Sequence, residues 1–100
     1  MKNIMIAGER LDIKEKQILG AFVLDVEAGT NGYKGGDAEH GSRTYFAILP
    51  GSGGVIEIER LGENGDGFAV TLAGDWELNQ IITALEFILD TLREGAEWTT

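Results

Sequence analysis

The residues best suited to chemistry lie together in one glycine-rich stretch, residues 29–45, with the sequence GTNGYKGGDAEHGSRTY. Glycines let neighbouring backbone amides converge on an anion, and an arginine and a lysine in the same stretch add positive charge. These residue types are typical of a site that holds phosphate or a nucleotide. The candidate ligand-binding residues are Thr30, Asn31, Tyr33, Lys34, Gly35, Gly36, Asp37, His40, Ser42 and Arg43.

Each candidate has an expected role. Arg43 would bind phosphate through two parallel hydrogen bonds, Lys34 would add a point charge, and the amides around Gly35 and Gly36 would complete the cradle. The residues expected to contact sugar hydroxyls or to hold the loop are Thr30, Asn31, Asp37 and His40. The rings available for stacking on a base are those of Tyr33 and Tyr45.

The spacing matches neither the phosphate-loop pattern nor the dinucleotide pattern GxGxxG that opens a helix. An ordinary glycine-rich crossing between two strands, with its polar groups in water, is an equally good interpretation. The stretch alone therefore leaves both interpretations open, and it does not name a ligand.

Metal or hydrolytic chemistry is a weaker interpretation of the same stretch. Asp37, Glu39 and His40 could contact one cation, and a histidine beside a carboxylate is a common general base. However, the chain has a single histidine and no cysteine, so a histidine-rich or thiolate zinc site is excluded. We expect no metal, no cofactor and no catalytic residue.

A second glycine-rich segment, residues 62–67, contains Glu63, Asn64 and Asp66 and superficially resembles a calcium loop. It lacks the twelve-residue spacing and the closing glutamate of such loops. An ordinary hairpin turn is the favoured interpretation.

Strands are expected to flank the candidate site. Alternating apolar residues predict strands over residues 22–28, 43–49, 55–61 and 68–72, and residues 2–7 also read as a short strand. Ile56 and Ile58 are expected to point inward, and residues 50–54 and 62–67 are expected to form turns. Residues 11–22 fit a helix or a strand equally well. Short strands joined by tight turns favour an antiparallel meander.

One helix is expected over residues 76–93, with Asp75 as its N-cap and Gly95 as its end. Its apolar stripe, expected to be buried on the sheet, comprises Leu78, Ile81, Ile82, Leu85, Ile88, Leu89 and Leu92. The predicted fold class is therefore α+β, a small antiparallel sheet packed against one long C-terminal helix. Residues 1–100 are expected to form a single domain.

Composition limits the partners. The net charge of −9 opposes binding to long nucleic acids but allows a small anion to bind where basic groups converge. The apolar run near the N-terminus is too short for a signal peptide or a membrane span, so a cytoplasmic location is expected. Phe87 lies off the helical stripe and Trp98 has few apolar neighbours in sequence. Either a second copy of the chain covers these rings, in a homodimer or larger homo-oligomer, or both are simply half-exposed.

The blocks GTNGY (residues 29–33), GGD (35–37) and HGSRTYF (40–46), followed by a small meander and a helix preceded by Gly-Asp, resemble the phage-encoded Thoeris anti-defence signal-sponge family. The resemblance covers about residues 23–93. It implies binding without chemistry, because that family sequesters cyclic ADP-ribose signals made by TIR-domain enzymes, and some members hold cyclic oligonucleotides made by cGAS-like enzymes. It also implies dimers or larger rings with ligand sites at subunit boundaries.

The leading hypothesis is therefore a phage anti-defence protein that acts in the cytoplasm of the infected bacterial cell. It would bind and sequester a nucleotide-derived immune signal, a cyclic ADP-ribose isomer or a cyclic oligonucleotide, without cleaving it. The alternatives are a protein-interaction module that inhibits a host protein through its acidic surface and, third, a metal-dependent phosphodiesterase.

Overall fold

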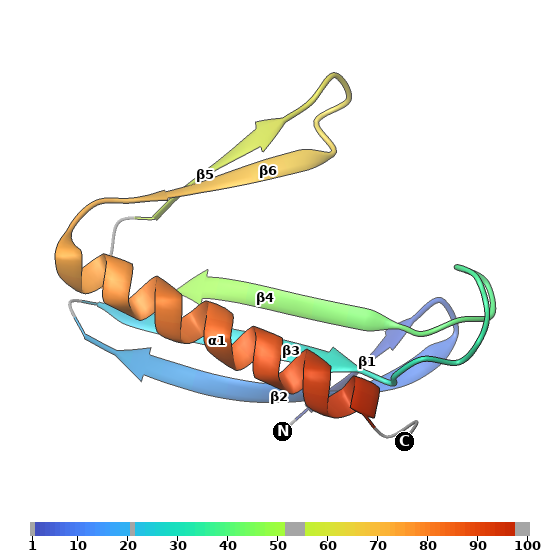
Figure 1. Cartoon of the computed structure of the whole chain (residues 1–100). Helices are drawn as coiled ribbons and strands as arrows, with labels where there is room; N and C mark the ends of the chain where they lie inside the picture. The colour runs from blue at the N-terminus through green and yellow to red at the C-terminus, as the bar shows by residue number, and fades with distance from the viewer. Residues whose placement is uncertain (1, 21, 52–55, 98–100) are drawn as a thin grey trace.

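A computed structural model describes residues 2–20, 22–51 and 56–97 of the chain. Their secondary-structure elements are, in order, β1 Lys2–Ile6, β2 Glu9–Leu19, β3 Val23–Thr30, β4 Thr44–Pro50, β5 Ile56–Leu61, β6 Gly67–Leu72 and α1 Asp75–Glu97 (Figure 1). A sheet with one long helix across it confirms the expected α+β class. Within these ranges, no helix is long and apolar enough to cross a membrane.

The first four strands form an antiparallel sheet in the order β1-β2-β3-β4, which is a meander. Most of the ambiguous segment, residues 11–22, belongs to strand β2. The first part of β2, Glu9 to Ile13, pairs with β1, and the second part, Lys14 to Leu19, pairs with β3. This one strand therefore joins two differently placed neighbours.

The mixed hydrophobic pattern of β2 has a physical cause. Leu11 and Ile13, which are 1% and 0% exposed, lie on the face away from α1, whereas Ile18, 7% exposed, belongs to the core under α1. Side chains alternate between faces along a strand, so a strand that changes its buried face midway shows no single period. Strand β2 thus contributes to two cores, a small one beside β1 and the main one beneath α1.

The main core lies between β3 and α1. Leu24, Val26 and Ala28 of β3 are fully buried, which confirms the alternation predicted for this strand. The other buried members are Ile18, Phe22, Ala84 and Ile88, and the partly buried side chains packed against them are Ile48, Ile56, Ile81, Leu72, Phe87 and Leu92. The contribution of β5 and β6 to this core is therefore limited to Ile56 and Leu72, at the base of their hairpin.

Helix α1 extends beyond both predicted ends. Asp75 is its first residue and not its cap, because the carbonyl of Gly74 already accepts a hydrogen bond of 3.0 Å from the amide of Leu78. The expectation that Gly95 ends the helix is wrong, because α1 continues to Glu97. Gly95 instead permits a close approach, since a Cβ there would lie 2.6 Å from Cγ2 of Thr30.

The predicted apolar stripe of α1 is only partly buried. The fully packed positions are Gln80, Ala84, Ile88 and Thr91, whereas Leu78, Ile82, Leu85 and Leu89 are about half exposed. The buried Gln80 donates to the carbonyl oxygens of Phe22 at 2.7 Å and Ile18 at 3.4 Å. Gln80 thus faces the sheet, and part of the apolar stripe of α1 lies beside the sheet instead of on it.

The aromatic residues have different environments. Phe87 is half-buried against the core, and the ammonium of Lys16 lies 5.9 Å from its ring centroid, so Phe87 is covered within one chain. Trp98 lies outside the described residues.

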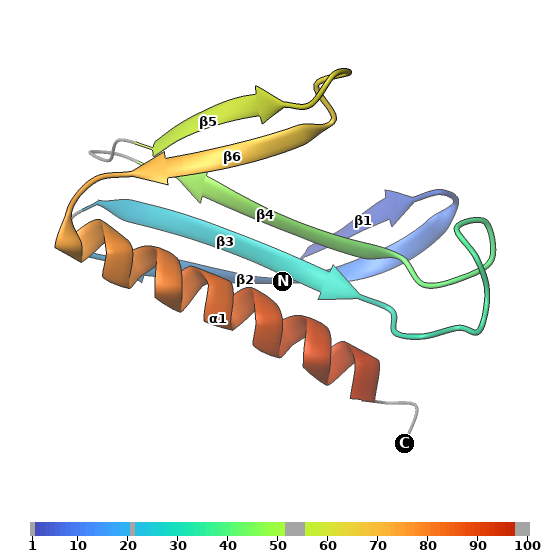
Figure 2. The same cartoon turned by 45° about the horizontal axis from the view of Figure 1, so that its top comes forward.

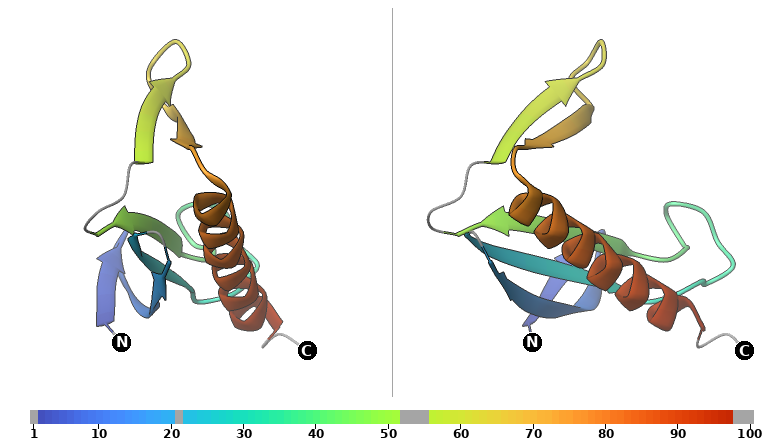
Figure 3. Two further views of the ribbon diagram at one scale, coloured as in Figure 1. Left: turned by 90° about the vertical axis from the view of Figure 1, so that its left-hand side faces the viewer. Right: turned by 60° about the vertical axis from the view of Figure 1, so that its left-hand side comes forward.

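Strands β5 and β6 pair only with each other, as a separate two-stranded sheet that does not extend the meander. The predicted turn at residues 62–67 is confirmed as their connection, whereas most of residues 50–54, and Val55, lie outside the described residues. The expectation that Ile58 points inward is wrong, because its side chain is 61% exposed. Figures 2 and 3 show the reason: the hairpin rises away from the sheet and from α1.

Candidate functional site

The glycine-rich stretch forms a loop, residues 31–43, between β3 and β4 at the end of the sheet near the C-terminus of α1 (Figure 1). Thr30 and Thr44 are partners across the last pair of the ladder, and their hydroxyl oxygens lie 2.9 Å apart. Asn31 accepts a 2.7 Å hydrogen bond from the amide of Arg43 through its side chain. The predicted residues Thr30 and Asn31 thus close the base of the loop.

Arg43 is buried, with 6% exposed, and its guanidinium is fully occupied within the chain. Nε donates to Ile6, Nη1 to Gly41 and Ser42, and Nη2 to Ala7 and Glu39, all through carbonyl oxygens at 3.0 to 3.4 Å. A carboxylate oxygen of Glu9 lies 3.5 Å away. An arginine has five N–H donors, and five carbonyls receive them here. The expected phosphate contact of Arg43 is therefore corrected: this side chain fastens the loop to the β1–β2 turn.

The tip of the loop is a turn organised by Asp37. One carboxylate oxygen accepts hydrogen bonds from the amides of Glu39, at 3.0 Å, and His40, at 3.2 Å, and lies 3.3 Å from Nδ1 of His40. The Glu39 amide, followed by the side chain and the amide of His40, lowers the pKa of Asp37 from its ordinary value of 3.8. Asp37 and His40 therefore hold the loop, which is one of the two roles expected for them. Both side chains are exposed.

The glycines of the loop serve its folding. A Cβ on Gly36 would come within 3.0 Å of the backbone of His40 and Gly41, and one on Gly41 would collide with the carbonyl oxygens of Asp37 and Gly36. Gly35 has a positive φ of 78°, which favours glycine. The amides of residues 39, 40 and 41 all bond to Asp37. These three amides are therefore occupied inside the turn. The anion cradle expected at Gly35 and Gly36 stays a prediction, and no contact in the described structure supports it.

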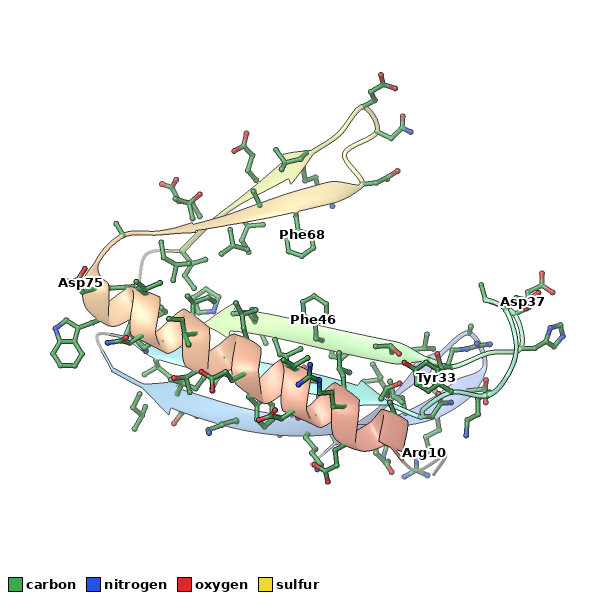
Figure 4. All side chains as sticks on the ribbon, viewed as in Figure 1. Arg10, Tyr33, Asp37, Phe46, Phe68 and Asp75 are labelled. Carbon is green, nitrogen blue, oxygen red and sulfur yellow. The ribbon has the colours of Figure 1, made fainter. Side chains whose placement is uncertain are left out.

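Three predicted residues do meet around one hollow of about 210 Å³ between the loop and the end of α1. Thr30, Tyr33 and Ser42 line it together with residues that were not among the predicted ligand contacts, namely Gly32, Thr44, Leu92 and Ala96. Thr30, Thr44 and Ser42 supply hydroxyl groups, and the side chain of Tyr33 is 69% exposed. In Figure 4, Tyr33 lies near the end of α1 and Asp37 lies out at the loop tip. The structure therefore separates the hollow beside Tyr33 from the Asp37–His40 turn.

Tyr45 is not beside this hollow. Its hydroxyl donates a 3.0 Å hydrogen bond to Glu27, which also accepts one of 2.8 Å from Lys2. The Lys2 hydrogen bond is the largest cause of the lowered pKa of Glu27, and burial is the largest cause of the raised pKa of Tyr45. Tyr45 thus ties β4 to β3 and β1, and Tyr33 is the more exposed of the two tyrosine rings.

A neighbouring hollow of about 290 Å³ also borders Thr30, on the side of Lys14 and Glu94. Nζ of Lys14 lies 3.0 Å from the carboxylate of Glu94, in an exposed ion pair. Sequence reasoning missed Lys14 because it lies in the segment left ambiguous between helix and strand. Lys34, the basic residue expected in the site, is exposed on the loop itself.

Within the described ranges, no group of three or more histidine, cysteine, aspartate or glutamate side chains is placed to hold a metal ion. No family model matches the chain, and neither a curated protein nor a solved structure matches it.

Proposed function

We propose that this protein binds and sequesters a nucleotide-derived signal, such as a cyclic ADP-ribose isomer or a cyclic oligonucleotide, without cleaving it. The observation that carries the proposal is the hollow where Thr30, Ser42 and Thr44 gather beside the exposed ring of Tyr33. Hydroxyl groups both donate and accept hydrogen bonds, as ribose hydroxyls do, and an aromatic face can stack on a base. In a phage-infected cell, such binding would keep the signal from its receptor.

The size and charge of the hollow indicate which part of a ligand enters it. A volume of about 210 Å³ is smaller than the roughly 300–1,000 Å³ typical of pockets for whole drug-sized ligands. Leu92 and Ala96 place the hollow at the C-terminal end of α1, where the helix dipole disfavours an anion. A sugar or base would therefore occupy the hollow, and its phosphates would lie outward over the loop, on the side of Lys34.

The position of Asp37 and His40, the expected acid–base residues, supports binding of a ligand over its cleavage. Asp37 accepts two amide hydrogen bonds and faces His40 at the loop tip, outside the residues that line the hollow. A general base must reach the proton that it removes. A sugar held beside Tyr33 would not have this pair aimed at it.

The direct test is calorimetric titration of the purified protein with cyclic ADP-ribose isomers and with cyclic oligonucleotides. Recovered ligand is then analysed by chromatography after the protein has been denatured by heat. We expect a saturable binding signal with at least one ligand and recovery of that ligand intact. No binding to any of them, or recovery of an altered ligand, would refute the proposal.

Two variants locate the binding. Tyr33→Ala should weaken binding by about 1–3 kcal/mol if the ring stacks on a base, and Thr44→Val removes one hydroxyl of the hollow at nearly constant shape. Asn64→Ala, in the exposed turn of the β5–β6 hairpin and outside the residues that line the hollow, is the matched control and should bind as the wild type does. Equal affinity of all three variants for the ligand would show that the ligand does not bind in this hollow.

A protein-interaction module is the second candidate function. Trp76 and Leu19, both 71% exposed, border a hollow of about 190 Å³ at the start of α1. Exposed tryptophan is a common anchor in protein interfaces, and the neighbouring Asp75 and Glu77 agree with an acidic docking surface. Trp76→Ala distinguishes the two functions, because it should abolish capture of a host protein and leave ligand binding unchanged.

A further inference from the structure

The second half of strand β2 has an open edge. Strand β1 pairs only with Glu9 to Ile13, whereas β3 pairs with Lys14 to Leu19 on the opposite side. Along Lys14 to Leu19, the side of β2 away from β3 therefore meets no other described strand, and Figure 1 shows β2 at the border of the sheet there. An open strand edge is able to pair with an extended peptide.

The alternation of the ladder shows which backbone groups point to this edge. The carbonyl of Val23 accepts a 2.7 Å hydrogen bond from the amide of Gly51, so Val23 turns its backbone groups towards the end of β4. The next residue, Leu24, then turns its groups towards Ile18, its partner in β2. Gln17, the neighbour of Ile18, therefore directs its N–H and C=O groups away from β3 and to the open edge.

A hollow on the α1 side of this edge suits one side chain. It measures about 190 Å³, below the roughly 300–1,000 Å³ of pockets that hold whole small molecules. Its lining includes Ile18, Trp76 and Gln80, and the side chain of Trp76 is 71% exposed. Gln80 is 4% exposed, and its Oε1 accepts no hydrogen bond from any described residue. A buried acceptor without a donor costs free energy, which an incoming N–H or O–H group would recover.

A second hollow lies on the opposite face of the same edge, and it is acidic. It measures about 380 Å³, and its lining includes Glu15, Asp25 and Glu27. Side chains alternate along β2, so Glu15 faces away from α1, whereas Lys16, which also borders the hollow, extends its ammonium towards α1. Lys2 offsets one of the three carboxylates through its 2.8 Å contact with Glu27. The excess of negative charge favours a basic side chain.

We propose that this edge binds an extended segment of a partner protein, which adds a strand to the sheet beside Lys14 to Leu19. Successive side chains of a strand point to opposite faces. An aromatic residue with an N–H or O–H group would fill the hollow beside Trp76, and a basic residue next to it in sequence would enter the acidic hollow. The inference rests on the second candidate function, the protein-interaction module, and is independent of nucleotide binding.

Charge favours a basic foreign segment over a second copy of this chain. Each copy carries a net charge of −9, so a second copy would bring more negative charge to the acidic hollow. Lysines on an edge strand, here Lys14 and Lys16, also oppose the pairing of two like edges. A basic segment meets neither obstacle at the acidic hollow.

The test uses short acetylated peptides of alternating valine and threonine, with a central tryptophan between two lysines. They are titrated into the isotope-labelled protein and followed by nuclear magnetic resonance. We expect saturable shifts of the amide signals of Gln17 and of Leu19, which alternates with Ile18 in the same way. Peptides with alanine for tryptophan, glutamate for both lysines, or methylated backbone amides should each bind at least about tenfold more weakly, the change expected when one buried hydrogen bond is lost.

Gln17→Pro tests the edge in the protein itself, and Gln17→Ala is its matched control. Proline removes the N–H that points to the edge but takes no part in the β3 ladder, a position where strands tolerate proline. Gln17→Pro should weaken peptide binding at least about tenfold, whereas Gln17→Ala keeps the N–H and should bind as the wild type does. Trp76→Ala should weaken binding at least about thirtyfold, as for a hot-spot residue.

Circular dichroism verifies that each variant is folded, and the methylated peptide tests the same hydrogen bonds without any change to the protein. Absence of shifts with every peptide, or undiminished binding of the methylated peptide, overturns the inference. Capture of a host protein that Trp76→Ala abolishes and a folded Gln17→Pro leaves intact overturns it as well, but retains the protein-interaction module. Shifts of the same amides on raising the protein concentration alone would assign the edge to a second copy and count equally against it.

Discussion

The loop of residues 31–43 and the β5–β6 hairpin are the two projections of this molecule, and they are held in opposite ways. The loop has no regular backbone ladder, yet its polar groups bond to one another and to the buried guanidinium of Arg43. The hairpin has a complete ladder, but its apolar face is open apart from Ile56 and Leu72 at its base. Regular secondary structure is therefore a poor guide to which projection is complete within one chain.

The difference lies in where each projection finds its stabilising partners. The loop satisfies its carbonyl groups inside the same chain, so its shape is present before any ligand arrives. The hairpin leaves side chains of large apolar area without cover, and the hydrophobic effect favours their removal from water by a partner. The loop is thus complete within one chain, whereas the hairpin leaves an apolar face open.

The largest expected effect comes from removing the fastening of the loop. Arg43→Met keeps similar bulk but removes the donor of the buried carbonyl of Gly41 and of the part-buried carbonyls of Ile6 and Glu39. We expect the free energy of unfolding to fall by about 3 kcal/mol or more, because each unsatisfied buried polar group costs roughly 1–3 kcal/mol. Urea denaturation at one fixed, low protein concentration measures this loss.

The matched change in the hairpin is Arg60→Met. Its guanidinium donates one exposed hydrogen bond of 3.3 Å to the carbonyl of Gly65. The loss should be within about 0.5 kcal/mol, as for most surface substitutions. Equal losses for the two arginine variants would break the contrast between a fastened loop and an open hairpin.

An intermediate effect is expected from Gly41→Ala. The added Cβ would collide with the carbonyl oxygens of Asp37 and Gly36, and backbone atoms cannot move aside as a flexible side chain can. A cost of about 1–3 kcal/mol is typical of such overpacking. Amide exchange in residues 31–43 should accelerate, whereas Ser42→Ala, at the exposed neighbouring position, should leave exchange unchanged. Unchanged exchange in Gly41→Ala would show that the loop is looser than the structure describes.

The smallest expected effect is a dependence of the loop tip on acid. The pKa of Asp37 is lowered in the folded chain, so its ionised carboxylate stabilises the turn above its ordinary pKa of 3.8, and this contribution is lost as the pH falls through the lower folded value. Nuclear magnetic resonance should show the amides of Glu39 and His40 shifting in that acidic range. Asp37→Asn should abolish the shift, and amide signals that titrate unchanged in this variant would contradict the assignment.

The sequence predicts the fold class and the β3 strand well because both depend on local periodicity. Leu24, Val26 and Ala28 alternate along one strand with one buried face, and that pattern is visible without a structure. Strand β2 could not be assigned, since Leu11 and Ile18 are buried on opposite faces, and the face of Ile18 is covered by α1, which lies far away in sequence. The burial of the apolar stripe of α1 was overestimated for a related reason. The sequence shows that Leu85 is apolar but does not show which neighbour covers it.

The candidate site shows the same limit for polar residues. The glycine-rich composition correctly marks residues 31–43 as an unusual loop. It cannot show that Arg43 turns inward to five carbonyl oxygens. Four of these carbonyl groups belong to Ile6, Ala7, Gly41 and Ser42, whose side chains give no indication of an arginine partner. Thr44 and Leu92 join Thr30 and Ser42 at the hollow only through the packing of α1.

Strand β2 has a consequence for how the molecule unfolds. Its first half seals the small core beside β1, and its second half seals the main core beneath α1. Loss of either core unpairs the same continuous strand, so neither can melt and leave the other whole. The four-stranded sheet and α1 should therefore lose their structure in a single cooperative transition, with the two cores sharing one melting temperature.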